Sequence, residues 1–138
     1  MSLYEQDFYQ WTQEQAALLK AGALAQLDIE NLIEEVESMG KSQKRELYSR
    51  LVVLIMHMLK WDYQPDMQSR SWENTILTQR REIRFLIQDN PSLKRTVFEA
   101  ANFVYRDSVD AASIETGLPI SAFPENCPYS VEQIMGNL

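Results

Sequence analysis

Apolar residues recur every three or four positions between Leu47 and Trp61, the spacing that places them on one face of a helix. The residues of this face are Leu47, Leu51, Leu54, Ile55, Met58 and Leu59. Three more apolar residues extend it most of the way round: Val52, Val53 and Met56. A helix with one side in water would not need so broad an apolar surface. The pattern therefore predicts the central, buried helix of a bundle, beginning near Ser42.

The same periodicity predicts four other main helices, each with an apolar face and with residues typical of helix ends at its boundaries. Their expected ranges are Asp7 to Gly22, Asp28 to Met39, Ser71 to Asn90, and Ser92 to Gly117. Gly40 is expected to separate the second of these helices from the central one. Pro65 is expected to end the central helix, because the residue before a proline is biased away from helical angles.

The segment after Gly117 contains three prolines and then Ser130-x-x-Gln133, a capping box that predicts a short last helix. The sequence has no Asn-Gly hairpin, no alternating strand pattern and no internal repeat. It therefore predicts an all-α fold: a single helical bundle of five main helices plus a short C-terminal helix. Its length predicts that residues 1–138 form one all-helical domain.

The composition is that of a globular chain, with 138 residues, 45% hydrophobic and 24% charged. No apolar run reaches the roughly 18 residues that a membrane span needs. The N-terminus lacks the basic and then apolar regions of a signal peptide. Cys127 is the only cysteine, so no internal disulfide can form and a reducing compartment fits best. We therefore expect a cytoplasmic protein without a membrane partner.

The net charge of −7 is unevenly distributed along the chain. Residues 1–46 hold nine acids and four bases (−5), residues 47–95 five acids and eight bases (+3), and residues 96–138 six acids and one base (−5). Nonspecific nucleic-acid binding needs a clustered positive surface to neutralise phosphates. A nucleic-acid partner is therefore not expected, and the basic middle third is more simply explained by packing against acidic neighbours.

Several blocks of the sequence together resemble one family. They are DFYQWTQEQAALLKAG, LDIENLIEEVESMGKSQKRELYSRL, HMLKWDYQP, SRSWENTILTQR, NPSLK, ETGLP and FPENCPYSVEQIM, in this order. They identify the chain as similar to domain-of-unknown-function family 29, short bacterial proteins that are especially numerous in cyanobacteria. The resemblance implies an all-helical domain without an assigned activity, and it adds no chemistry.

One narrow polar strip interrupts the central helix, and it carries Arg50 and the only histidine, His57. The simplest interpretation of His57 is structural, with its ring bonded to a carboxylate or a carbonyl. A catalytic interpretation is also open, since a base and a phosphate-holding cation two helical turns apart could share a pocket. Nucleases of the HEPN type (higher-eukaryote and prokaryote nucleotide-binding) are helical and carry an arginine and a histidine at a similar spacing.

A metal site would need Glu30, Glu34 or Glu37 to join His57, because bundle cores can hold metals with carboxylate and histidine ligands. Such sites draw on Glu-x-x-His pairs, and the chain has none. The glutamates are more simply a solvated helix face paired with neighbouring bases. We therefore expect no metal and no cofactor, and Glu34 remains only a candidate for binding.

Aromatic residues surround the loop that follows the central helix. Trp61, Tyr63 and Trp72, together with Arg80, are candidates to line a binding pocket there. Packing of the tryptophans into the core is the simpler alternative.

No complete catalytic set of residues can be assembled from the sequence, so an enzyme is not favoured. We expect a small helical interaction module that binds a protein partner or associates with itself. The alternative is a HEPN-like ribonuclease or phosphate-ester hydrolase that uses Arg50 and His57.

Overall fold

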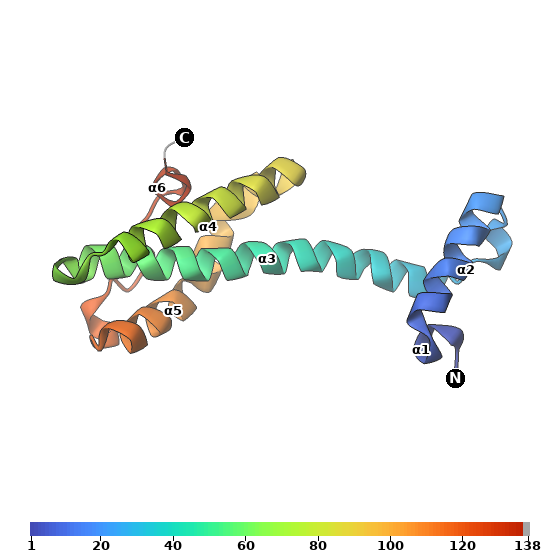
Figure 1. The fold of residues 1–138 in the computed structure, drawn as a ribbon, viewed down its shortest axis with the longest axis horizontal. Coiled ribbons are helices and arrows are strands. Elements are labelled where there is room, and N and C mark those ends of the chain that lie inside the picture. The colour runs from blue at the N-terminus through green and yellow to red at the C-terminus, as the bar shows by residue number, and fades with distance from the viewer. Residues whose placement is uncertain (137–138) are drawn as a thin grey trace. The chain divides into compact units, whose positions relative to one another are not determined.

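Helices and short 3₁₀ turns form all the regular structure in the computed structural model, which describes residues 1–136. The α-helices are α1 (Leu3–Gln6), α2 (Phe8–Ala21), α3 (Ile29–Tyr63), α4 (Arg70–Asp89), α5 (Val97–Thr116) and α6 (Val131–Met135). The 3₁₀ turns are Leu24–Gln26, Pro65–Met67, Pro91–Thr96 and Ile120–Ala122. No strand occurs in this part of the chain, and the expected all-α fold is confirmed (Figure 1). None of the helices in residues 1–136 is long and apolar enough to cross a membrane.

The break expected at Gly40 is absent, because α3 runs through this residue without interruption. Gly22 and Gly117 adopt positive φ angles of 70° and 77° and end α2 and α5, as expected from their positions. Gly40 is not among the glycines with positive φ. A single glycine costs a helix only about 1 kcal/mol, which the strong helix formers on both sides can offset.

Gly40 offers a direct test of this account. We expect Gly40→Ala to raise the free energy of unfolding by about 0.5–1 kcal/mol, because alanine restricts the unfolded chain and favours the helix. A Cβ atom at this position would meet no other atom within 4 Å. Urea unfolding followed by circular dichroism measures the change. Gly22→Ala is the matched control and should destabilise, since Gly22 has a φ of 70°.

The contacts along the chain divide it into two compact units, Met1–Ser42 (unit 1) and Gln43–Leu138 (unit 2). That residues 1–138 form one all-helical domain stays a prediction.

Unit 1 is organised around Trp11, which is 4% exposed. The Trp11 indole donates a hydrogen bond of 2.9 Å to the Asp28 carboxylate, and the Asp28 amide donates to the Gln15 side chain at 2.8 Å. Asp28 also accepts from Asn31, and these donors lower its pKa below the ordinary value. Tyr4 packs edge-on against the Trp11 ring. The start of α3 is therefore tied to α2 by side chains.

Unit 2 holds the main core, and the prediction for its central segment is confirmed. Leu51, Leu54, Ile55 and Leu59 have no exposed surface, and Met58 is also buried. α4 and α5 lie along this part of α3 (Figure 1). The residues that they contribute to the core are Ile83, Leu86, Val97, Ala100, Ala101, Val104, Tyr105, Val109 and Ala112.

The segment after α5 is held against the rest of unit 2 by contacts with three helices, α3, α4 and α5. The Tyr105 hydroxyl donates to the Pro124 carbonyl at 2.6 Å, and the Tyr129 hydroxyl donates to the Asp62 carboxylate at 2.7 Å. Arg80 donates to the last carbonyls of α6. The capping box of Ser130 and Gln133 is present as expected.

Candidate functional site

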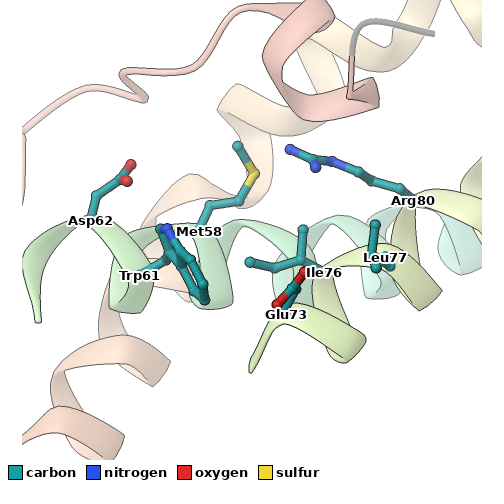
Figure 2. Close-up of a pocket in the computed structure, with 7 residues that line it drawn as sticks. All are labelled: Met58, Trp61, Asp62, Glu73, Ile76, Leu77 and Arg80. Carbon is teal, nitrogen blue, oxygen red and sulfur yellow. The ribbon is translucent and has the colours of Figure 1, made fainter. Parts of the chain in front are cut away.

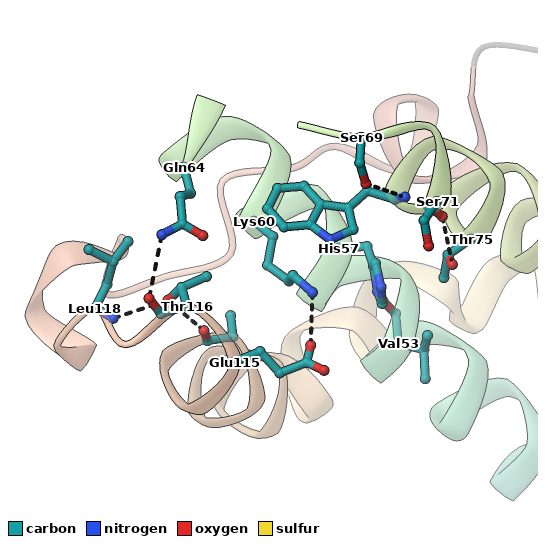
Figure 3. A network of polar contacts seen from close by, with 12 residues as sticks. Val53, His57, Lys60, Gln64, Ser69, Ser71, Thr75, Glu115, Thr116 and Leu118 are labelled. Carbon is teal, nitrogen blue, oxygen red and sulfur yellow. Dashed lines mark hydrogen bonds and ion pairs between the residues drawn. The ribbon is translucent and has the colours of Figure 1, made fainter. Parts of the chain in front are cut away.

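His57 and Arg50 each have separate partners in the structure. The His57 ring nitrogen Nδ1 lies 2.9 Å from the Val53 carbonyl oxygen (Figure 3). A carbonyl can only accept, so Nδ1 donates the hydrogen in this contact. The bond to a carbonyl matches the structural interpretation of this histidine.

The Arg50 guanidinium lies 3.6 Å from the Glu46 carboxylate and 3.9 Å from that of Glu82. Seven residues separate Arg50 from His57, which is about 10 Å along a helix axis. Arg50 therefore pairs with carboxylates of α4 and of its own helix. No hydrogen bond between described residues joins it to His57. A nuclease pair formed by these two residues stays a hypothesis.

Lys60 belongs to the same polar strip of the central helix as Arg50 and His57, and no role was predicted for it from the sequence. It is 7% exposed, and its ammonium lies 3.0 Å from the Glu115 carboxylate of α5 (Figure 3). The same ammonium lies 4.7 Å from the centre of the Trp72 ring of α4. A carboxylate and an aromatic face both stabilise a buried cation. Lys60 therefore joins three helices, which is a structural role.

A cavity near the end of α3 brings together two of the four candidate binding residues, and a binding role for them stays a prediction. A cavity of about 360 Å³ is lined by Met58, Trp61, Asp62, Glu73, Ile76, Leu77 and Arg80 (Figure 2). Trp61 and Arg80 are the candidate residues that line it. Tyr63 and Trp72 do not: Tyr63 packs against Phe123, and Trp72 covers Lys60.

The polar groups of this cavity are largely engaged elsewhere. Arg80 Nε lies 3.0 Å from the Ile134 carbonyl oxygen, and its Nη2 lies 2.7 Å from that of Gln133. Burial, and then the charge of Arg84, lower the pKa of the Arg80 guanidinium. Asp62 accepts the Tyr129 hydroxyl. The side chains therefore fasten α6 and leave few free groups to bind a ligand.

Glu34 is exposed, and it does not belong to a metal site in the part of the chain that the structure describes. No three histidine, cysteine, aspartate or glutamate side chains gather in residues 1–136 in a way that could hold an ion. The ion pairs expected between the neighbouring glutamates and Lys41, Lys44 or Arg45 are also absent there.

The apolar face predicted on the helix from Asp28 to Met39 is largely exposed, and only its Leu32 is half-buried. Ile29, Ile33, Val36 and Met39, named here the apolar stripe, are 54%, 53%, 60% and 61% exposed. The periodicity shows which face of a helix is apolar, but not whether another part of the chain covers it. Glu30, Glu34 and Glu37 flank the stripe and take part in none of the ion pairs in residues 1–136.

Comparison with known proteins places the chain in a family without adding a chemical role. No curated protein and no solved structure matches it. The model of the family described as "Domain of unknown function DUF29" matches residues 3–137, and the chain therefore belongs to this family.

Proposed function

We propose that this protein is a non-enzymatic interaction module that binds a protein partner through the apolar stripe of unit 1. The observation that carries the proposal is the exposure of all four stripe residues, each by more than half. They recur at spacings of four, three and three residues, which is the pattern of anchors on a helix that lies in a groove. Contiguous exposed apolar surface of this kind is typical of an interaction site.

A comparison within α3 supports the proposal. Leu47, Leu51 and Leu54 repeat the spacing of Ile29, Ile33 and Val36, and they have no exposed surface. Side chains of α4 and α5 belong to the same core as these leucines. The stripe offers the same apolar pattern, so another helical surface would suit it. Burial of a half-exposed Ile or Val contributes about 1 kcal/mol.

The small core of unit 1 is a second argument. Trp11 and Gln15 are its only buried residues in the described chain. Units of about 40 residues usually need further support to be stable. A partner that covered the stripe would supply such support.

Site-specific photocrosslinking in cells tests the proposal. A photoreactive amino acid at Ile33 or Val36 should form protein crosslinks that disappear when Ile29 and Met39 are both changed to aspartate. The control position is Ile114, which is 83% exposed on α5 and should give no comparable product. Melting temperatures of the purified variants establish that folding is retained. Absence of crosslinks at both stripe positions would contradict the proposal.

The alternative of a ribonuclease or phosphate-ester hydrolase rests on Arg50 and His57. No contact between described residues favours it over the structural roles of Arg50 and His57.

A further inference from the structure

The outer face of α4 in unit 2 combines apolar and basic groups. Leu77 and Phe85 are 55% and 52% exposed. Arg81 and Arg84 lie on the same side of the helix, four and seven residues after Leu77. We name these four residues the arginine face.

The charges of the arginine face are poorly compensated within the chain. The nearest carboxylate to Arg81 is that of the adjacent Glu82, at 4.0 Å, and Arg81 is 54% exposed. Arg84 takes part in none of the ion pairs between described residues. Burial, and then the positive charge of Arg84, lower the pKa of Arg80, so Arg84 lies close enough to act on its neighbour.

The arginine face and the apolar stripe are complementary in both charge and pattern. Residues 1–42 contain eight acids and two bases, a net charge of −6, and three of these acids flank the stripe. The stripe is about 15 Å long, from Ile29 to Met39, and the arginine face is about 12 Å long. Each surface presents large apolar side chains, and the charged residues beside them have opposite signs: glutamates flank the stripe, and arginines belong to the arginine face.

We propose that the partner of the apolar stripe is a second copy of this chain, whose arginine face packs against it. This inference rests on the proposed function. Ile33 and Val36 of one copy contact Leu77 and Phe85 of the other, and Glu34 and Glu37 pair with Arg81 and Arg84. Every copy carries both surfaces, so reciprocal docking gives a closed dimer and one-way docking gives a chain of copies.

Pairing of two stripes is disfavoured by their charges. Such a contact would bring the glutamates of one copy against those of the other, and like charges across an interface cost free energy. The arginine face of a second copy replaces this repulsion with attraction.

A charge-swap experiment tests the inference with full-length protein. The first variant carries Glu34→Lys and Glu37→Lys, and the second carries Arg81→Glu and Arg84→Glu. Wild type should sediment as a dimer or a larger assembly. Each variant alone should associate about tenfold more weakly or worse, because every docked pair then repels. An equimolar mixture should restore the wild-type affinity. The altered stripe of the first variant attracts the altered arginine face of the second, and the two unchanged surfaces attract as in wild type.

Two control variants separate this effect from a general change in charge. Glu5→Lys with Glu14→Lys matches the charge of the first variant, and Lys94→Glu with Arg95→Glu matches that of the second; all four positions are exposed and lie outside both surfaces, so both controls should associate like wild type. Native mass spectrometry of the mixture, with one variant isotopically labelled, should show assemblies that contain both variants. Circular dichroism and melting temperature confirm that every variant is folded.

Four results would overturn the inference. If Arg81→Glu with Arg84→Glu associates as strongly as wild type, the copies meet through other surfaces. Failure of the mixture to restore association would exclude pairing of Glu34 and Glu37 with Arg81 and Arg84. A monomeric wild type whose stripe crosslinks to a different protein would reject self-association and retain the proposed function, whereas a monomer without stripe crosslinks would reject both.

Discussion

Replacing Leu54 with alanine is expected to lower the free energy of unfolding by about 2–5 kcal/mol. Leu54 has no exposed surface and lies in the middle of the core that α3, α4 and α5 share. The substitution removes apolar contacts and leaves a cavity that rigid helices can close only in part. Urea unfolding followed by circular dichroism and tryptophan fluorescence gives the difference.

Ile114→Ala is the matched control for this substitution. Ile114 also lies on a long helix, but it is 83% exposed, so its replacement should change the stability by no more than about 0.5 kcal/mol. A loss at Leu54 as small as that at Ile114 would remove α3 from the centre of the core.

Alkaline pH is expected to destabilise unit 2 through Tyr129. This residue is 9% exposed, and its hydroxyl donates to the Asp62 carboxylate at 2.7 Å. Burial, and then the hydrogen bond to Asp62, raise the pKa of Tyr129 far above its ordinary value. Ionisation in the folded protein would place a buried phenolate beside a carboxylate.

The direction of the effect follows from proton binding. An unfolded tyrosine loses its proton near pH 10, whereas folded Tyr129 keeps it at higher pH. The folded state then binds more protons than the unfolded state, so stability is present below about pH 10 and falls as the pH rises. The slope is at most about 1.4 kcal/mol per pH unit for this one group. Tyr105 acts in the same direction, because burial raises its pKa to about 12.

Chemical unfolding at a series of pH values from 8 upward measures this slope, with about 10 as the expected onset. Tyr129→Phe should lose stability at neutral pH, where Asp62 loses its donor, and should show a shallower decline above the onset. Tyr9→Phe is the control and should follow wild type, since Tyr9 is 72% exposed. Equal slopes for wild type and Tyr129→Phe would exclude Tyr129 as the group responsible.

The parts of the fold that sequence could predict are those set by neighbouring residues. The face formed by Leu51, Leu54 and Leu59 is dense enough to require burial whatever surrounds it, and it is buried. The ends at Gly22 and Gly117 and the capping box at Ser130 depend on local backbone geometry. Residues within one turn therefore determine them.

The features that escaped prediction depend on distant residues or on small energy differences. A break at Gly40 was expected because glycine commonly ends helices, but a mid-helix glycine costs too little to stop α3. Lys60 reads as an ordinary polar position, and its partner Glu115 lies 55 residues away. Arg80 was expected beside a pocket, yet its main bonds go to carbonyls 53 and 54 residues later. The residues near Lys60 or Arg80 in the sequence do not predict these distant contacts.

The fastening of the segment after α5 has a consequence for the rate at which unit 2 folds. Its closing contacts join residues far apart in sequence: Asp62 and Tyr129 are separated by 67 residues, and Arg80 and Ile134 by 54. Helical proteins fold fast when their contacts are local, and distant contacts slow them because long loops must close first. Unit 2 should therefore collapse early around α3 and complete its structure late. Until α6 docks, the site that buries Ile134 lies open to water, and aggregation competes with folding during that interval.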